Sequence, residues 1–191
     1  RGERGVMASP PRADRPTAML DRSRAALVVV DVQEGFRKAI PDFEEIARRT
    51  ATLVEGARIL GVPAVVTEQY PKGLGHTVDE VGLNGEPVLE KTVFAASCAE
   101  GFDLEGRDQV VVCGIEAHVC VHQTVEDLAA RGVEVHVCAD AVASRDPANK
   151  VVALERAERA GAVPTTVEMA LLELCGRAGT DEFKAVQRLI K

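Results

Sequence analysis

Three side chains that could act as nucleophile, base and cation follow three separate apolar segments of the chain. Asp31 and Lys91 each end an apolar run of strand length. Cys120 follows a β-branched run over 109–113, which stops at Gly114 and gives way to a helical pattern. A carboxylate, an ammonium and a helix-start thiol at three strand ends together predict a site for nucleophilic chemistry.

The position of Cys120 predicts a reactive thiol. The first turn of a helix carries a partial positive charge, which lowers the pKa of a thiol there and raises the thiolate fraction at neutral pH. No Ser, Thr, Asp or Asn precedes the turn to cap it, so its amide groups are candidates for an oxyanion hole. The cysteines that lie in apolar runs are interpreted as small buried residues, and these are Cys113, Cys138 and Cys175.

The base for this thiol is expected to be Asp31 and not a neighbouring histidine. His118 and His122 each lie two residues from Cys120, so on a helix they point in other directions. Their i,i+4 spacing suits a metal ion, but neither the adjacent Glu nor an acidic third ligand is present. A carboxylate at the end of a central strand is partly desolvated, which lets its pKa rise toward a base's working range. Taken alone, Asp31 is equally consistent with a turn residue and Lys91 with a surface lysine.

These residues need a scaffold that brings distant strand ends together. Strands are predicted over 25–30, 63–67, 87–90, 109–113, 133–138 and 163–167, and helices over 43–60, 118–131, 147–160, 168–175 and 180–190. Alternating strands and helices with short connections form right-handed βαβ units. The predicted fold is α/β, a three-layer α/β/α sandwich with a mainly parallel, six-stranded Rossmann-like sheet. Ligands of such sheets bind beyond the carboxyl ends of the strands.

Two local features of this scaffold are also predicted. Asp42 is expected to cap the helix over 43–60, with Glu45 completing a capping box and Gly61 ending the helix. The stretch 70–86 is rich in glycine and poor in periodicity. It is therefore predicted to be a long loop over the strand ends, either functional or a passive insertion.

The composition restricts the number of domains and the class of partner. The 191 residues, 46% of them apolar, suffice for a single domain, expected over 21–191 behind a flexible tail over 1–20. The net charge is −7 and the basic residues are scattered among acidic ones, so neither nucleic acid nor a membrane is an expected partner. Five cysteines without a CxxC pair indicate reduced thiols, and no membrane span or secretory signal is visible. A cytoplasmic protein is expected.

The motifs of several common enzyme classes are missing from the sequence. No GxGxxG follows the first strand and no GxxxxGK[ST] occurs, so dinucleotide and P-loop nucleotide binding lack sequence support. The serine elbow GxSxG of α/β-hydrolases is also missing. No cofactor is therefore expected, and the partner is expected to be a small-molecule substrate.

The residues around these positions resemble the isochorismatase-like cysteine hydrolases, a superfamily that includes nicotinamidases and carbamoylsarcosine amidases. The similarity spans roughly residues 25–175, and as a set its motifs are specific. It is closest to the branch of isochorismatase-domain-containing proteins. The motifs are Asp31-Val32-Gln33 with Phe36, Glu68-Gln69-Tyr70-Pro71-Lys72-Gly73-Leu74-Gly75, Lys91, Gly114-Ile115-Glu116-Ala117-His118-Val119-Cys120-Val121 with Gln123-Thr124, Asp140-Ala141 with Ser144-Arg145, Thr165-Thr166-Val167-Glu168, and Phe183-Lys184-Ala185-Val186-Gln187.

The resemblance implies a catalytic triad and an oxyanion hole. Cys120 would be the nucleophile, Asp31 the base that accepts its proton and later returns one to the leaving group, and Lys91 the cation that orients Asp31. A cis peptide bond between Ile115 and Glu116 is also implied, with the amides of Glu116 and Cys120 forming the oxyanion hole. The expected walls of the substrate pocket are Phe36, Tyr70 and Phe94.

Departures from the family pattern narrow the expected activity. Metal-binding nicotinamidases carry an Asp-x-His after the second strand, where this sequence has Gln69-Tyr70-Pro71. No metal is therefore expected, and nicotinamide is a poor candidate substrate. Family members without the cysteine cleave the vinyl ether of isochorismate, whereas this chain keeps Cys120. The resemblance thus implies C–N hydrolysis of a small amide-like substrate through a thioester.

Two functions from other classes stay open. A non-catalytic binding or scaffold protein would keep the fold and oligomer without turnover, and a redox-sensing thiol would form a sulfenate without hydrolysis. The retained Asp31, Lys91 and Cys120 argue against a scaffold, whereas a normal thiol pKa at Cys120 would argue for one. The helices over 147–160 and 168–175 carry more apolar surface than one domain covers, so a homo-oligomer, a dimer or larger, is expected.

Overall fold

Residues just before the first predicted strand contact the core of the molecule. The computed structural model describes residues 19–191, so residues 1–18 of the expected tail over 1–20 lie outside the described residues. Leu20, which the sequence placed in that tail, is buried in the core, and its amide donates to Glu173 Oε2 at 2.9 Å. The buried side chain of Gln109 accepts a hydrogen bond from the Asp21 amide at 2.7 Å. The single domain over 21–191 stays a prediction, and these contacts add Leu20 to its core.

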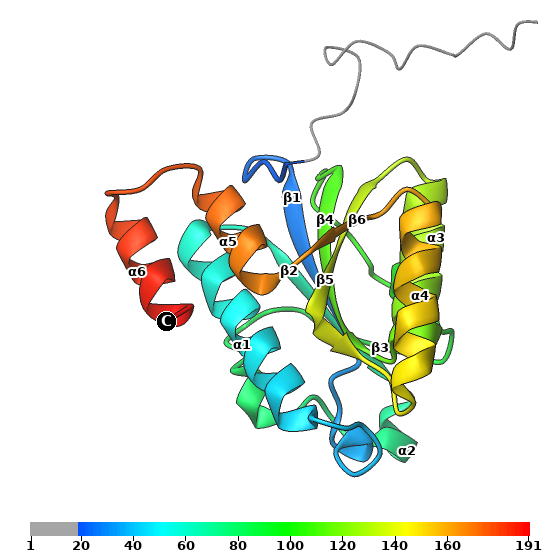
Figure 1. The fold of residues 1–191 in the computed structure, drawn as a ribbon. Helices are drawn as coiled ribbons and strands as arrows, with labels where there is room; N and C mark the ends of the chain where they lie inside the picture. Colours follow the sequence, from blue (N-terminus) through cyan, green and yellow to red (C-terminus); the bar gives the residue numbers. More distant parts are fainter. Residues whose placement is uncertain (1–18) are drawn as a thin grey trace, which may run out of the picture.

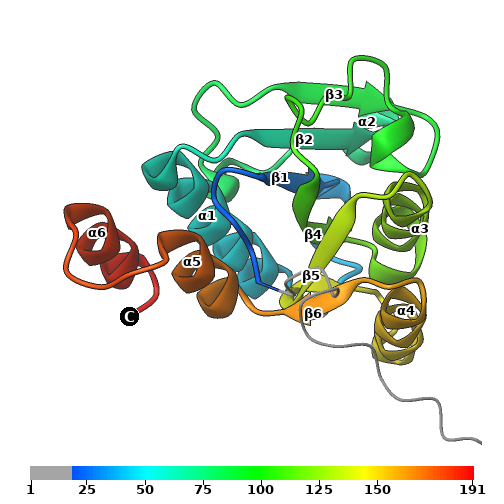
Figure 2. The same ribbon diagram turned by 90° about the horizontal axis from the view of Figure 1, so that it is seen from above.

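Six parallel strands form one sheet, in the order β3-β2-β1-β4-β5-β6 (Figure 2). This confirms the predicted number and direction of the strands. The first and fourth strands are central neighbours, so the chain leaving one lies beside the chain leaving the other. The strands are β1 (Ala25–Val30), β2 (Ala64–Gln69), β3 (Val88–Lys91), β4 (Gln109–Ile115), β5 (Glu134–Ala143) and β6 (Val163–Thr165).

Helices cover both faces of the sheet, which confirms the three-layer α/β/α sandwich (Figures 1 and 2). One layer holds α1 (Phe43–Leu60), α5 (Val167–Cys175) and α6 (Asp181–Leu189), and the other holds α3 (His122–Ala130) and α4 (Pro147–Arg159). Strand β1 is buried along its whole length, with Leu27 and Val29 facing the first layer and Val28 and Val30 the second. Burial on both faces explains its continuous apolar run. Across residues 19–191, no helix has the length and apolar character needed to span a bilayer.

The central strands β1 and β4 approach each other closely at Gly114. This residue has φ +123°, a conformation that side chains rarely adopt, and a Cβ there would lie 1.9 Å from the Val30 carbonyl oxygen. Only glycine therefore fits, and it brings the end of β4 against the end of β1. The chain then enters a π-helical turn, Ala117–Val121, before α3. The sequence had predicted an ordinary helix from residue 118.

The predicted capping box of α1 is wrong, although the helix bounds are right. Asp42 adopts a left-handed conformation with φ 55°, and its side chain caps no amide. The Glu45 carboxylate instead accepts hydrogen bonds from Arg48 and Arg49, because charged donors are stronger partners than a neutral amide. At the other end Gly61 is left-handed, as expected, and its amide donates to the Arg58 carbonyl at 3.2 Å.

The stretch 70–86, predicted to be a long loop over the strand ends, is partly helical. It contains α2 (Pro71–Leu74) and a 3-10 turn, Asp79–Val81. The Gln33 side chain donates to the Gly75 carbonyl at 2.7 Å, and Gln33 also forms an isolated β-bridge with Thr77. The stretch is therefore fastened to the chain that follows β1, near the carboxyl ends of β1 and β2 (Figure 1).

Candidate active site

The Asp31 carboxylate is fully buried at the end of β1. Its Oδ2 accepts a hydrogen bond from Lys91 Nζ at 2.8 Å, and its Oδ1 accepts one from Thr67 Oγ1 at 2.7 Å. The backbone has φ 51°, and its amide donates to the Thr67 carbonyl at 3.1 Å. These contacts direct the carboxylate past β2 toward the edge strand β3. The structure thus brings together two residues that are 60 positions apart.

The Lys91 ammonium is enclosed by oxygen atoms. Besides Asp31, it donates to Gln69 Oε1 at 2.7 Å, to the Phe94 carbonyl at 2.9 Å and to the Val93 carbonyl at 3.4 Å. The side chain has no exposed surface. Burying an ammonium is costly unless it is paired and hydrogen-bonded, and here every hydrogen has an acceptor. The alternative that Lys91 is an ordinary surface lysine is therefore wrong.

The Cys120 thiol lies in the π-helical turn and is within interaction range of this ion pair. The residue is 4% exposed, and its Sγ is 3.9 Å from Gln69 Oε1. Burial raises the pKa of the Cys120 thiol to about 12, with the Asp31 carboxylate raising it further and the Lys91 ammonium lowering it. The pKa therefore shifts in the direction opposite to the expected lowering, because desolvation disfavours the charged thiolate. At neutral pH the thiol keeps its proton.

The turn that carries Cys120 is fixed by its neighbours. Thr124 Oγ1 donates to the Cys120 carbonyl at 2.6 Å and accepts from the Ala96 amide at 2.8 Å. No side chain caps the first turn, as the sequence predicted. The peptide bond between Ile115 and Glu116 is cis, as the resemblance implied.

The two nearby histidines are engaged away from the thiol. His118 Nδ1 is 2.9 Å from Ser144 Oγ, and His122 Nε2 is 3.6 Å from Glu126 Oε1. Burial lowers the pKa of His122. Within residues 19–191, no group of three or more His, Cys, Asp or Glu side chains is placed to hold a metal ion.

A cavity of about 340 Å³ lies beside Lys91, and Tyr70 is one of its walls. Of the three expected pocket residues only Tyr70 lines it. Phe36 is half-buried against the core, and Phe94 is 49% exposed. Phe36 misses the cavity because its ring joins the apolar core. The lining residues are Tyr70, Pro71, Lys72, Glu90, Lys91 and Thr92.

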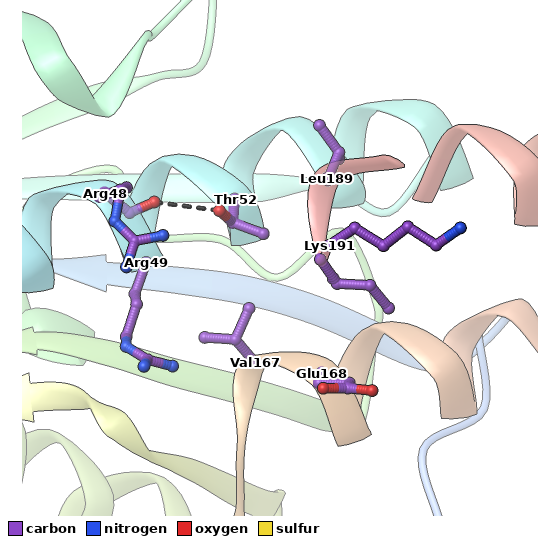
Figure 3. A pocket seen from close by; sticks show the side chains of 8 residues that line it. Arg48, Arg49, Thr52, Val167, Glu168, Leu189 and Lys191 are labelled. Carbon is purple, nitrogen blue, oxygen red and sulfur yellow. Dashed lines mark hydrogen bonds between the residues drawn. The ribbon is translucent and has the colours of Figure 1, made fainter. Parts of the chain in front are cut away.

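A second cavity, of about 240 Å³, lies among α1, α5 and α6 (Figure 3). Its arginines are already paired, since Arg49 Nη1 is 2.5 Å from Asp140 Oδ2 and both Arg48 and Arg49 contact Glu45. None of the candidate catalytic side chains lines it, so it is separate from the site described above. The lining residues are Arg48, Arg49, Thr52, Val167, Glu168, Leu189, Ile190 and Lys191.

Sequence reasoning assigned no role to two residues of β2 that contact the ion pair. Thr67 is fully buried and donates to Asp31, and Gln69 accepts from Lys91. The sequence feature that could have identified them is a group of polar side chains near the carboxyl end of an otherwise apolar strand, where ligands of parallel sheets bind.

The fold and this arrangement of side chains define an α/β domain of the isochorismatase type. The family model of the Isochorismatase domain matches residues 25–169. The chain therefore belongs to the isochorismatase family.

Named relatives agree with this placement. The chain is 46% identical over 166 residues to isochorismatase domain-containing protein 1 of Salmo salar, covering 84% of this chain and 59% of that relative. It is 43% identical over 170 residues to isochorismatase domain-containing protein 2 of Homo sapiens, covering 87% and 83%. A solved structure from Caenorhabditis elegans, described as MAR1 ribonuclease, is similar with a TM-score of 0.86 and 43% identity, covering 90% and 92%. The chain spans 59% of the length of the Salmo salar relative.

Proposed function

We propose that this chain is a cysteine hydrolase that cleaves the C–N bond of a small amide-like substrate without a metal ion. The observation that supports this most is the buried Asp31–Lys91 ion pair beside the Cys120 thiol. Buried ion pairs cost desolvation energy, so they are kept mainly where they have a function. A strongly shifted pKa, such as that of the Cys120 thiol, is also typical of functional sites. Membership of the isochorismatase family supports hydrolysis as the class of reaction.

In the first half of the proposed reaction, the Cys120 sulfur attacks the carbonyl carbon of the substrate. Because the thiol is protonated at neutral pH, Asp31 accepts its proton as the S–C bond forms. The carbonyl oxygen takes up the negative charge, and the amides of Glu116 and Cys120 donate hydrogen bonds to it. The C–N bond then breaks as Asp31 returns the proton to the leaving amine, and a thioester remains on Cys120.

In the second half, one water molecule attacks the thioester carbon. Asp31 accepts a proton from this water, and the carbonyl oxygen is again held by the two amides. The C–S bond breaks, the sulfur leaves with its bonding electrons, and Asp31 returns the proton to it. The products are a carboxylic acid and an amine, and Lys91 stays charged throughout.

The residues at the end of β2 and directly after it support a reaction without a metal ion. Gln69, Tyr70 and Pro71 occupy the positions at which the family resemblance places metal ligands. Gln69 Oε1 accepts from the Lys91 ammonium at 2.7 Å, so a cation bound to this oxygen would lie against a fixed positive charge. Tyr70 is 54% exposed, and the Pro71 side chain has no donor atom.

The test is turnover of a panel of small amides by the wild-type chain and by Cys120→Ala. We expect the substitution to reduce turnover by more than about a thousandfold, because the nucleophile is removed. Mass spectrometry of the wild-type reaction is expected to detect an acyl adduct on the Cys120 peptide. Cys98→Ala, which changes an exposed cysteine, is the control and should keep wild-type activity. Undiminished turnover by Cys120→Ala would sink the proposed mechanism.

The burial of Cys120 argues against a redox-sensing function. Redox-sensor thiols are exposed and have a low pKa. Cys120 is 4% exposed, and burial raises its pKa to about 12. After brief exposure to hydrogen peroxide, we expect a sulfenate-specific probe to label Cys98 before Cys120.

Hydrolysis of RNA is a second candidate because the similar Caenorhabditis elegans protein is described as a ribonuclease. Contacts to RNA phosphates need lysine or arginine side chains that are free to bind them. The chain carries a net charge of −7, and arginine side chains are paired with carboxylates. Arg37, for example, contacts the carboxylates of Glu34, Glu44 and Glu80. Incubation with labelled RNA is therefore expected to give no cleavage. If wild type cleaves RNA and Cys120→Ala does not, the substrate is RNA and not a small amide.

We also infer that copies of this chain assemble into a homo-oligomer in the cytoplasm. Val151 and Val152 on α4 are 57% and 54% exposed, and contiguous exposed apolar side chains are typical of contact surfaces. All five cysteines are free thiols, which is the usual state in a reducing compartment.

A further inference from the structure

Gln69 is a neutral side chain that contacts both the cation and the thiol of the candidate site. Its Oε1 accepts from Lys91 Nζ at 2.7 Å and is 3.9 Å from Cys120 Sγ. Its Nε2 donates to the Thr92 carbonyl at 2.9 Å. This orientation of the amide is the only favourable one. A flipped amide would place its NH₂ group against the ammonium and its oxygen against a carbonyl oxygen.

The backbone of Gln69 is fixed as firmly as its side chain. Gln33, which is fully buried, accepts a hydrogen bond from the Gln69 amide at 2.7 Å. The same Gln33 side chain donates to the Gln69 carbonyl at 3.0 Å and to the Gly75 carbonyl at 2.7 Å. A residue held through both backbone and side chain leaves the ammonium only by breaking several hydrogen bonds at once. Its oxygen is therefore a permanent part of the site.

The charge of the site depends on Gln69 being neutral. The charged groups that act on the Cys120 thiol are Asp31 from β1 and Lys91 from β3, and Gln69 is the contribution of β2. The Gln69 oxygen completes the set of acceptors around Lys91 without adding a charge. A carboxylate at this position would compete with Asp31 for the ammonium. It would also repel the thiolate that forms on Cys120.

We propose that Gln69 is a positioning residue of this site, whose neutral amide oxygen fixes the Lys91 ammonium between Asp31 and Cys120. Because Gln69 adds no charge, the charged groups of the site remain one carboxylate and one ammonium. The inference rests on the proposed function, because Cys120 is taken as the reacting thiol. It adds a side chain that acts through Lys91 to the three residues of the triad.

The test measures alkylation of Cys120 by iodoacetamide, from about pH 7 to about pH 10, by mass spectrometry of the Cys120 peptide. The variants are Gln69→Glu, which adds a charge, and Gln69→Leu, which removes the oxygen without adding one. Gln123→Glu is the matched control, because Gln123 is exposed on α3. We expect Gln69→Glu to react about tenfold more slowly than Gln69→Leu across this range. The control is expected to stay within about twofold of wild type.

Equal rates for Gln69→Glu and Gln69→Leu would overturn the proposal. A purely structural role would depend on the lost hydrogen bond and not on the added charge. The same spectra report folding, because Cys113 and Cys138 are fully buried and react only when the chain unfolds. Should Gln69→Glu unfold, Gln69→Asp is compared with Gln69→Leu by the same criterion. This measurement needs no substrate, so it can fail or succeed independently of the amide turnover that tests the proposed function.

Discussion

Lys91 and Gln69 differ in how far the sequence can reveal them. At a strand end a lysine taken alone is most simply a surface residue, and Lys91 became a candidate only together with Asp31 and Cys120 and through the family resemblance. Gln69 has no charge and no motif that distinguishes it. The two side chains meet because they are direct neighbours in the register of β2 and β3. Register depends on the packing of the whole sheet, so the contact could not be predicted from either residue alone.

Replacing Lys91 by Met is expected to lower both stability and activity. The substitution leaves the buried Asp31 carboxylate without its cation, and losing one partner of a buried pair typically costs about 3–5 kcal/mol. Urea unfolding at neutral pH would measure this loss. Lys72→Met, at the exposed rim of the neighbouring cavity, is the control and should change the free energy of unfolding by less than about 0.5 kcal/mol. Similar losses in both variants would contradict a buried ion pair.

Buried thiols are expected to make the protein less stable at alkaline pH. Burial raises the pKa of Cys113 and Cys120 to about 12, from an ordinary value of 9.0. Between these two values the unfolded chain releases thiol protons that the folded chain keeps. The free energy of unfolding therefore falls as the pH rises.

Urea unfolding at about pH 8 and about pH 10 would measure this dependence. Cys113→Ala is expected to reduce the fall in stability, because it removes one of the buried thiols. Cys98→Ala changes an exposed cysteine and is expected to keep the wild-type fall. The same fall in both variants would show that the buried thiols do not cause it.

At the scale of the elements, hydrophobic periodicity predicted regular segments well and irregular ones poorly. The bounds of α1 agree with the prediction, and those of α4 differ by one residue. Strand β5 continues from the predicted end at residue 138 to Ala143. Asp140 interrupts the apolar run there, and its carboxylate accepts a hydrogen bond from the Val167 amide at 3.0 Å. The hydrophobic pattern therefore stops at this polar residue, although the strand continues past it.

The contact between α1 and α5 gives a prediction at this scale. A Cβ on Gly56 would lie 2.4 Å from Leu171 Cδ2, and Leu171 is fully buried. Gly56→Val is expected to lower the free energy of unfolding by about 1–3 kcal/mol through overpacking. Leu171→Ala would create space for the new side chain. Urea unfolding of the double variant should therefore show less than the summed loss, whereas additive losses would contradict the contact.

At the scale of the whole molecule, the candidate site is assembled from β1, β2, β3 and the turn before α3. Alternating strands and helices predicted a parallel sheet, and the general behaviour of such sheets predicted which edge carries the site. The sequence pattern did not indicate which strands would be neighbours. Asp31 and Cys120 meet because β1 lies beside β4, where Gly114 contacts Val30. That pairing is decided by long-range packing and not by any local pattern.

The exposed surface of α4 gives the last prediction, which concerns assembly. If copies of the chain pack through Val151 and Val152, a carboxylate in that contact would be desolvated without a partner. Val152→Glu is therefore expected to reduce the molar mass measured by light scattering to that of one chain. Its melting curve should still show a folded protein, because the side chain is exposed within a single copy. Met169→Glu makes the same change on α5, the other helix with uncovered apolar surface, and leaves the molar mass unchanged if the contact is made through α4. If only Met169→Glu causes dissociation, the interface lies on α5 and not on α4. A new charge disrupts an interface only when the side chain that carries it lies inside that interface.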